Sequence, residues 1–124
     1  MLKTTVFRLA RWRNAHDPYG TGSAPIPERI ITRPPSAELR ADQTDQDSLP
    51  PYDVLDAILT RYMENDQGVE RIVAAGFDRT VVERVTRLVR VNEYKRRQAP
   101  VGIRVTHRSF GKDWRYPITS RFRS

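Results

Sequence analysis

The chain has 124 residues, enough for one modest domain, but nine Pro residues and 30% charged residues leave room for only a small apolar core. It contains no Cys, which excludes a disulfide framework, a thiolate nucleophile and a Cys-ligated metal, and which suits the cytoplasm. No segment approaches the ~20 apolar residues of a membrane span, and the basic N-terminus lacks the apolar run of a secretory signal.

Charge is distributed unevenly along the chain, whose overall formal charge is +7. Residues 1–56 carry seven Lys/Arg against eight Asp/Glu, a net charge of −1. Residues 57–124 carry fifteen Lys/Arg against seven Asp/Glu, a net charge of +8. The second half is therefore expected to bind anions, such as nucleotide phosphates, a nucleic-acid backbone or an acidic partner surface.

Residues 1–14 predict an amphipathic helix, whose apolar face contains Val6, Leu9 and Ala10. No N-terminal residue is available to cap it, and no nearby segment offers a surface for Phe7 and Trp12. A helix of about a dozen residues is marginal alone in water. We therefore expect the chain to begin inside a larger structure.

Residues 15–51 are predicted to be a long loop, with at most a short extended piece at Ile30 and Ile31. Two Pro-Pro pairs, at 34–35 and 50–51, bracket a polar acidic segment. Because Pro fixes φ and removes an amide donor, this segment cannot join a helix or sheet at low cost. Loops of this length are usually lids, binding loops or disordered linkers, and composition alone leaves these alternatives open.

Residues 52–98 predict a helical unit of short helices separated by turns. The first runs from Asp53 to about Met63, the second from Val69 to Ala75 with Gly76 as its stop, and the third begins after the N-cap residue Asp78. Residues 99–124 form a predicted extended tail, in which the aromatic residues have no clear period. We expect these to pack on a partner: Phe110, Trp114, Tyr116 and Phe122.

The residues alone also allow a nucleic-acid-binding helix-turn-helix module, formed by 69–75, the Gly76 turn and the helix from Asp78. Against it, the second helix begins with a Val pair and carries most of its cations at the far end. Nucleic-acid binding is therefore kept only as an alternative function, and nucleic acid is not the expected partner. His16 and His107 have no neighbouring ligand pattern, and we interpret both as surface residues rather than catalytic or metal-binding ones.

Two motifs in this chain resemble a known family. The runs PPSAEL at 34–39 and DSLPPY at 47–52 resemble the loop that follows the nucleotide-binding core of NAD synthetases. The run NEYKRRQAP at 92–100 resembles the C-terminal motif of the glutamine-dependent, two-domain members. Both occur in the expected order and at the expected separation.

The resemblance implies the mainly α, helical C-terminal portion of an α/β adenine-nucleotide α-hydrolase-like (Rossmann-like) synthetase domain. Its expected parts are a helix at 1–14, a loop at 15–51, a helical unit at 52–98 and a tail at 99–124. The catalytic nucleotide-binding core, the Mg ligands and the glutaminase domain are expected to lie outside this chain, so that the 124 residues alone would be inactive.

The resemblance also implies roles for particular residues. Lys3 and Ser36 match positions that contact ATP, although a solvated terminal Lys and a turn after Pro35 are the alternatives. Tyr94 and Lys95 match a pair that contacts deamido-NAD. No residue of this chain is expected to be a catalytic group or a metal ligand.

The implied reaction begins when Mg-ATP adenylates the nicotinate carboxylate of deamido-NAD. Ammonia from glutamine then displaces AMP and gives the amide. Cationic side chains would offset the phosphate and carboxylate charge gathered at such a site. The implied partners are the rest of the synthetase and glutaminase domains and further copies of the enzyme in a homo-oligomer, with no membrane.

Overall fold

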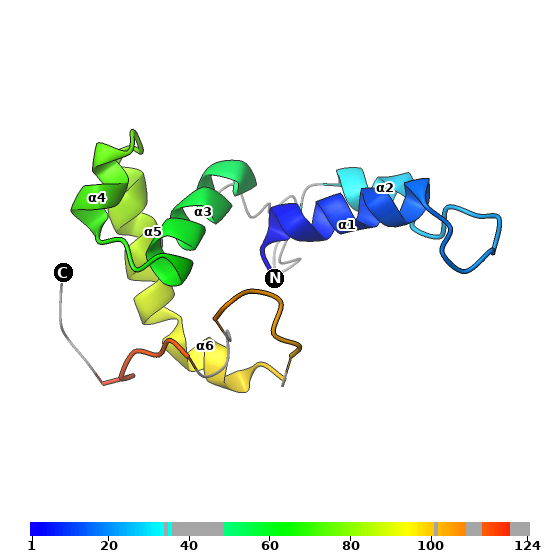
Figure 1. The fold of residues 1–124 in the computed structure, drawn as a ribbon. Helices are drawn as coiled ribbons and strands as arrows, with labels where there is room; N and C mark the ends of the chain where they lie inside the picture. Colours follow the sequence, from blue (N-terminus) through cyan, green and yellow to red (C-terminus); the bar gives the residue numbers. More distant parts are fainter. Residues whose placement is uncertain (34, 36–48, 101, 109–112, 120–124) are drawn as a thin grey trace, which may run out of the picture. The chain divides into compact units, whose positions relative to one another are not determined.

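The computed structural model describes residues 1–33, 35, 49–100, 102–108 and 113–119, and these residues form helices and loops without a strand (Figure 1). They belong to two compact units, Met1–Asp56 and Ala57–Ser124, which we describe one at a time. Within the part of the chain that is described, no helix has the length and apolar character needed to cross a lipid bilayer.

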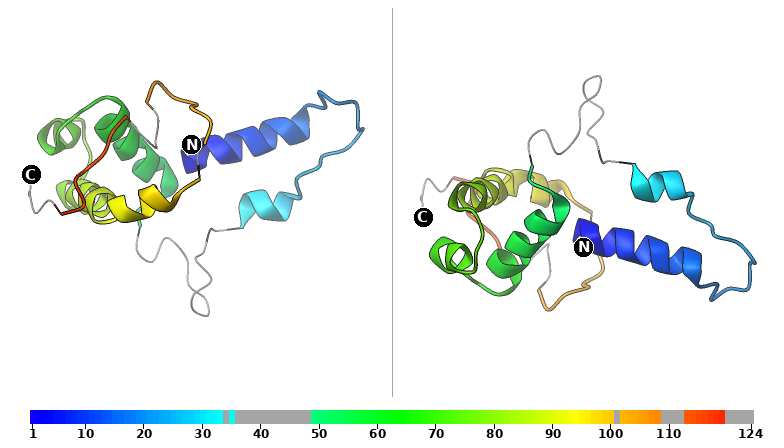
Figure 2. Two further views of the ribbon diagram at one scale, coloured as in Figure 1. Left: turned by 90° about the horizontal axis from the view of Figure 1, so that it is seen from below. Right: turned by 90° about the horizontal axis from the view of Figure 1, so that it is seen from above.

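The first unit contains a helical hairpin made of α1 (Lys3–Ala15) and α2 (Glu28–Thr32), which is visible in both views of Figure 2. The side-chain amide of Asn14 holds the connecting loop, because its Nδ2 donates to the carbonyl oxygen of Ile26 at 2.6 Å and its Oδ1 accepts from the amide of Ile26 at 3.0 Å. These reciprocal bonds fix where the chain turns back toward α1.

The predicted extended piece at Ile30 and Ile31 is wrong, because both residues lie in α2. Ile31 is buried, whereas Ile30 remains exposed. A five-residue helix shows too little periodicity to be recognised, and a helix this short forms only when packing supports it. The acidic Glu28 in its first turn, directly after Pro27, was the available start signal.

The helix predicted at 1–14 is confirmed as α1. No residue of α1 is buried, and Val6, Leu9 and Trp12 are exposed. An amphipathic helix normally buries its apolar stripe. Among the described residues, the apolar side chains of α1 therefore bury little surface.

The helical unit predicted at 52–98 is confirmed. It consists of α3 (Tyr52–Leu59), a π-helical turn (Thr60–Glu64), α4 (Val69–Ala74), α5 (Arg79–Val91) and α6 (Glu93–Gln98). Gly76 ends α4 with a φ of 97°, a conformation that favours glycine, and Asp78 caps α5 by accepting from the amide of Val81 at 3.0 Å.

The second unit has a small aliphatic core in which α4 packs against α5 and the π-helical turn (Figure 1). Its buried side chains come from α3, α4 and α5: Ile58, Ile72, Val82, Val85 and Thr86. The hydroxyl of Thr86 donates to the carbonyl oxygen of Glu83 at 3.1 Å, so its burial leaves no unmet donor.

The tail beyond residue 99 folds back on this unit in the parts that are described. Trp114 stands edge-on to Tyr62 with ring centroids 5.2 Å apart, and Tyr116 stands edge-on to Trp114 at 4.8 Å. The expectation that Trp114 and Tyr116 need an external partner is therefore wrong, because Tyr62 supplies their surface. Phe110 and Phe122 lie outside the described residues.

We predict that Ile72→Ala lowers the free energy of unfolding by about 2–5 kcal/mol, because the side chain is fully buried and its loss leaves a cavity. The matched control is Ile103→Ala, which removes the same atoms from a residue that is 92% exposed and should change stability by less than about 0.5 kcal/mol. Urea denaturation followed by circular dichroism measures both, and equal effects would contradict the assigned core.

Candidate functional site

The N-terminus of α1 receives its cap from α3. The preceding residue, Leu2, makes no side-chain capping bond, but the amide of Thr4 donates to Oδ2 of Asp56 at 2.7 Å. Asp56 is buried and lies 52 residues further along the chain. A carboxylate at this position satisfies an orphan amide and interacts favourably with the positive end of the helix dipole.

Lys3 is the first residue of α1 and lies next to this cap. Its side chain is half-buried, and Nζ stands 5.9 Å from the centroid of the Tyr52 ring. An ammonium over an aromatic face is attracted by the ring quadrupole. The contact with Tyr52 therefore orients the Lys3 side chain, which is not freely solvated.

The motif at 92–100 contains a buried ion cluster. The carboxylate of Glu93 is 1% exposed and accepts from two guanidinium groups: Nη1 of Arg96 at 2.8 Å through Oε2, and Nη1 of Arg115 at 3.0 Å through Oε1. Each carboxylate oxygen thus has its own charged donor, which makes these hydrogen bonds stronger than neutral ones.

Arg96 links this cluster to the tail. Its Nη2 donates to the backbone carbonyl oxygen of Trp114 at 2.7 Å, and its guanidinium lies 5.8 Å from the centroid of the Trp114 ring. Burial lowers the pKa of Arg96, and the neighbouring Arg115 lowers it further, while Glu93 acts in the opposite direction. Only a guanidinium, with its very high pKa, remains charged under such conditions.

Tyr94 and Lys95 lie between these two buried residues on α6 and are exposed, Tyr94 by 46%. Successive helical residues are 100° apart, so Glu93 and Arg96 share one face while the two residues between them point elsewhere. Both predicted ligand contacts on α6 are therefore accessible from solvent.

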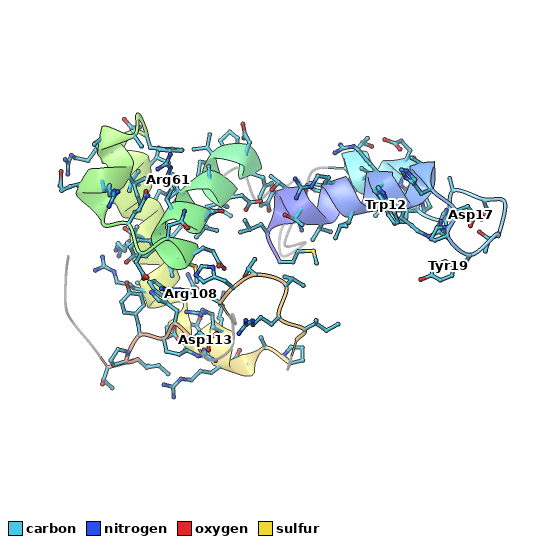
Figure 3. The ribbon with its side chains drawn as sticks, in the orientation of Figure 1. Trp12, Asp17, Tyr19, Arg61, Arg108 and Asp113 are labelled. Carbon is cyan, nitrogen blue, oxygen red and sulfur yellow. The ribbon has the colours of Figure 1, made fainter. Side chains whose placement is uncertain are left out.

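A second set of contacts holds the tail at residues 102–108. Arg108, labelled in Figure 3, donates to the carbonyl oxygen of Met63 at 3.0 Å and to both carboxylate oxygens of Asp66. Hydrogen bonding to Asp66 raises the pKa of Arg108. Thr106 donates to Oε1 of Glu64 at 2.8 Å, beside these contacts.

Among the described residues, no group of three or more His, Cys, Asp or Glu side chains is arranged to hold a metal ion. Both histidines lie on the surface. His16 stacks on Trp12 with ring centroids 4.8 Å apart, and Nδ1 of His107 lies 2.9 Å from Oε2 of Glu64.

The sequence matches the family model for NAD synthase over residues 1–99. The chain belongs to the NAD synthase family. Curated glutamine-dependent NAD(+) synthetases from Xanthomonas campestris pv. campestris and Acinetobacter baylyi are each 57% identical to it, over 123 and 121 residues. Each alignment covers 98% of this chain but only 21% and 22% of the relative, so the chain spans about a fifth of their length.

A solved structure agrees with these relatives. The glutamine-dependent NAD+ synthetase from Acinetobacter baumannii, in complex with adenosine diphosphate, superimposes with a TM-score of 0.55 at 50% sequence identity. The match covers 94% of this chain and 19% of that protein. The helical architecture of the described residues therefore agrees with a portion of a synthetase of this family.

The nucleic-acid alternative gains no support from these comparisons. In addition, Arg79, in the first turn of α5, is engaged within the chain: its Nη1 and Nη2 donate to the two oxygens of Glu70 at 2.7 and 2.6 Å. Arg79 lowers the pKa of Glu70 through this pair. A recognition helix needs such N-terminal positions for base contacts.

The residues that sequence reasoning had singled out fall in different places. Tyr94 and Lys95 lie together on α6 in the second unit, Lys3 belongs to the first unit, and Ser36 lies outside the described residues. The cluster of Glu93, Arg96 and Arg115 was missed, because a charge run usually indicates a solvated face. The i, i+3 spacing of the opposite charges of Glu93 and Arg96 was the only local signal.

We predict that Tyr116 ionises well above the ordinary tyrosine pKa of about 10. Burial raises its pKa, and the hydrogen bond between the Tyr116 and Tyr62 hydroxyls raises it further. The protonated Tyr116 is favoured in the folded state, so its contribution to the free energy of unfolding is complete below about pH 10. This contribution is lost as the pH rises through the raised pKa of the folded state.

The phenolate absorbance measured during alkaline titration tests this. Tyr116→Phe should remove the late-titrating component, whereas Tyr19→Phe, at an exposed position, should leave that component in place. Persistence of the late-titrating component in Tyr116→Phe would contradict the prediction.

Proposed function

We propose that this chain is a portion of a glutamine-dependent NAD+ synthetase, an ATP-dependent carbon–nitrogen ligase that amidates deamido-NAD. The observation that carries the proposal is the 57% identity to curated glutamine-dependent NAD(+) synthetases along almost the whole chain. The exposed pair Tyr94–Lys95 on α6 supports it, since these residues are accessible to a ligand.

The proposed chemistry explains why cations are useful here. A carboxylate is a poor electrophile near neutral pH. Its attack on the α-phosphorus of ATP forms an acyl adenylate and releases pyrophosphate, and ammonia can then displace AMP to give the amide. Negative charge from the phosphates and the substrate carboxylate gathers during this step, and fixed cations lower its cost. In this chain Lys95 would bind and orient deamido-NAD, and Tyr94 would stack on it or hydrogen-bond to it.

Lys3 and Ser36 are the proposed ATP contacts. Lys3 is held over Tyr52 at the N-terminus of α1, which is capped by Asp56, and an ammonium oriented in this way can attract phosphate oxygens. The ADP in the Acinetobacter baumannii structure supports nucleotide binding by the family. Magnesium, when bound with ATP, would neutralise phosphate charge, and we propose that its ligands lie in other parts of the enzyme.

The remaining features of the proposal concern the whole enzyme. We place the helical portion next to a Rossmann-like nucleotide-binding core, with the segment at 34–51 near the active site and a glutaminase domain as the ammonia source. The enzyme would be a cytoplasmic homo-oligomer, and the absence of Cys suits a reducing compartment. We propose that the chain consists of the parts 1–14, 15–51, 52–98 and 99–124, and α2 lies within the second of these.

We predict separate effects of two charge-neutralising variants in the complete synthetase. Lys95→Gln should raise the KM for deamido-NAD about tenfold or more and leave the KM for ATP nearly unchanged, because a charge-assisted contact to one substrate is lost. Lys3→Gln should do the reverse. Steady-state kinetics with each substrate varied in turn measures both constants.

Each variant has a matched control that also removes one positive charge from an exposed site on the same helix. These are Arg97→Gln on α6 and Arg8→Gln on α1. Both should leave each KM within about twofold. Equal increases in the control and the test variant would show that general charge, rather than the proposed contact, is responsible.

We also predict that the 124-residue chain alone converts no deamido-NAD to NAD+, with either glutamine or ammonia as nitrogen donor. Addition of the remaining parts of a synthetase from a relative, by co-expression, should restore conversion. Formation of NAD+ by the isolated chain, detected by liquid chromatography, would refute the proposal that the catalytic core lies in other parts of the enzyme.

A further inference from the structure

The helix α6 is held in the structure by charged rather than apolar side chains. Its buried residues are Glu93 and Arg96, and no apolar residue of α6 is buried. At six residues it is too short to be stable by itself. Its rotation about its own axis is therefore determined by the hydrogen bonds of these two residues.

Those bonds lead outward to the tail. Glu93 accepts from Arg115 at 3.0 Å, and Arg96 donates to the carbonyl oxygen of Trp114 at 2.7 Å. Residues 113–119 are held in turn by Tyr62, whose ring contacts Trp114 edge to face and whose hydroxyl is hydrogen-bonded to that of Tyr116. A continuous set of contacts thus connects Tyr62, in the π-helical turn, to the face of α6 that is opposite Tyr94 and Lys95.

We propose that Glu93, Arg96 and Arg115 are positioning residues that set the direction in which Tyr94 and Lys95 meet deamido-NAD, an inference that rests on the proposed function. Buried ion pairs contribute little net stability relative to apolar packing, but they specify geometry through directional bonds. If the cluster is disrupted, α6 can rotate or fray, and a small displacement of Lys95 weakens its contact with the substrate.

Arg115 offers the sharpest test, because its side chain is partly exposed and its replacement is less disruptive than that of Glu93. In the complete synthetase, Arg115→Gln should raise the KM for deamido-NAD about tenfold and leave the KM for ATP nearly unchanged. Arg115→Lys should recover much of the affinity, because it retains a donor and a charge. Glu93→Gln is the second variant and should resemble Arg115→Gln.

Arg97→Gln is the matched control, since it also removes a positive charge from α6 but leaves the cluster intact. Its KM for deamido-NAD should stay within about twofold of that of the unmodified enzyme. Lower thermal stability of Arg115→Gln and Glu93→Gln with an unchanged KM would show a purely structural role and overturn the proposal.

A double-mutant cycle separates positioning from direct ligand contact. If Arg115 acts through Lys95, then Arg115→Gln should add little to the KM of Lys95→Gln, whereas independent contacts would multiply their effects. Multiplicative effects would therefore overturn the inference. An unmodified enzyme that fails to amidate deamido-NAD would instead refute the proposed function, and this inference with it.

Discussion

The buried carboxylate of Glu93, bound by two guanidinium groups, is the interaction on which the C-terminal part of this molecule depends. Arg96 comes from the same helix and Arg115 from the tail, so one carboxylate joins two segments that lie 22 residues apart. Removal of either guanidinium would leave the buried charge of Glu93 less well compensated, a cost that is large in a protein interior. The directional hydrogen bonds of this cluster join α6 to the tail.

A similar use of charge occurs at the other end of the chain. The α1 helix buries none of its residues, yet its N-terminus is fixed by the carboxylate of Asp56 and its C-terminal loop by the amide of Asn14. The exposed apolar residues of α1 agree with a chain that corresponds to about a fifth of its relatives. In both places polar contacts hold a helix that buries none of its apolar side chains among the described residues.

Much of the helical unit could be predicted from the sequence. The apolar spacing, the N-cap at Asp78 and the stop at Gly76 act over only a few residues, and all three features are found where the patterns indicate. The short helix α2 could not be predicted in this way, because it depends on its packing against α1. The partner of Trp114 was likewise hidden, since Tyr62 lies 52 residues earlier in the chain.

The sequence by itself determined the family and most of the helices at 52–98, because motifs and helical periodicity are local properties of the chain. Only the tertiary structure decided that Glu93 and Arg96, within the same charged run, are buried and bound to the tail. A charged side chain is stable in a protein interior only when a partner meets it there. That partner, Arg115, is brought to Glu93 by the folding of the chain.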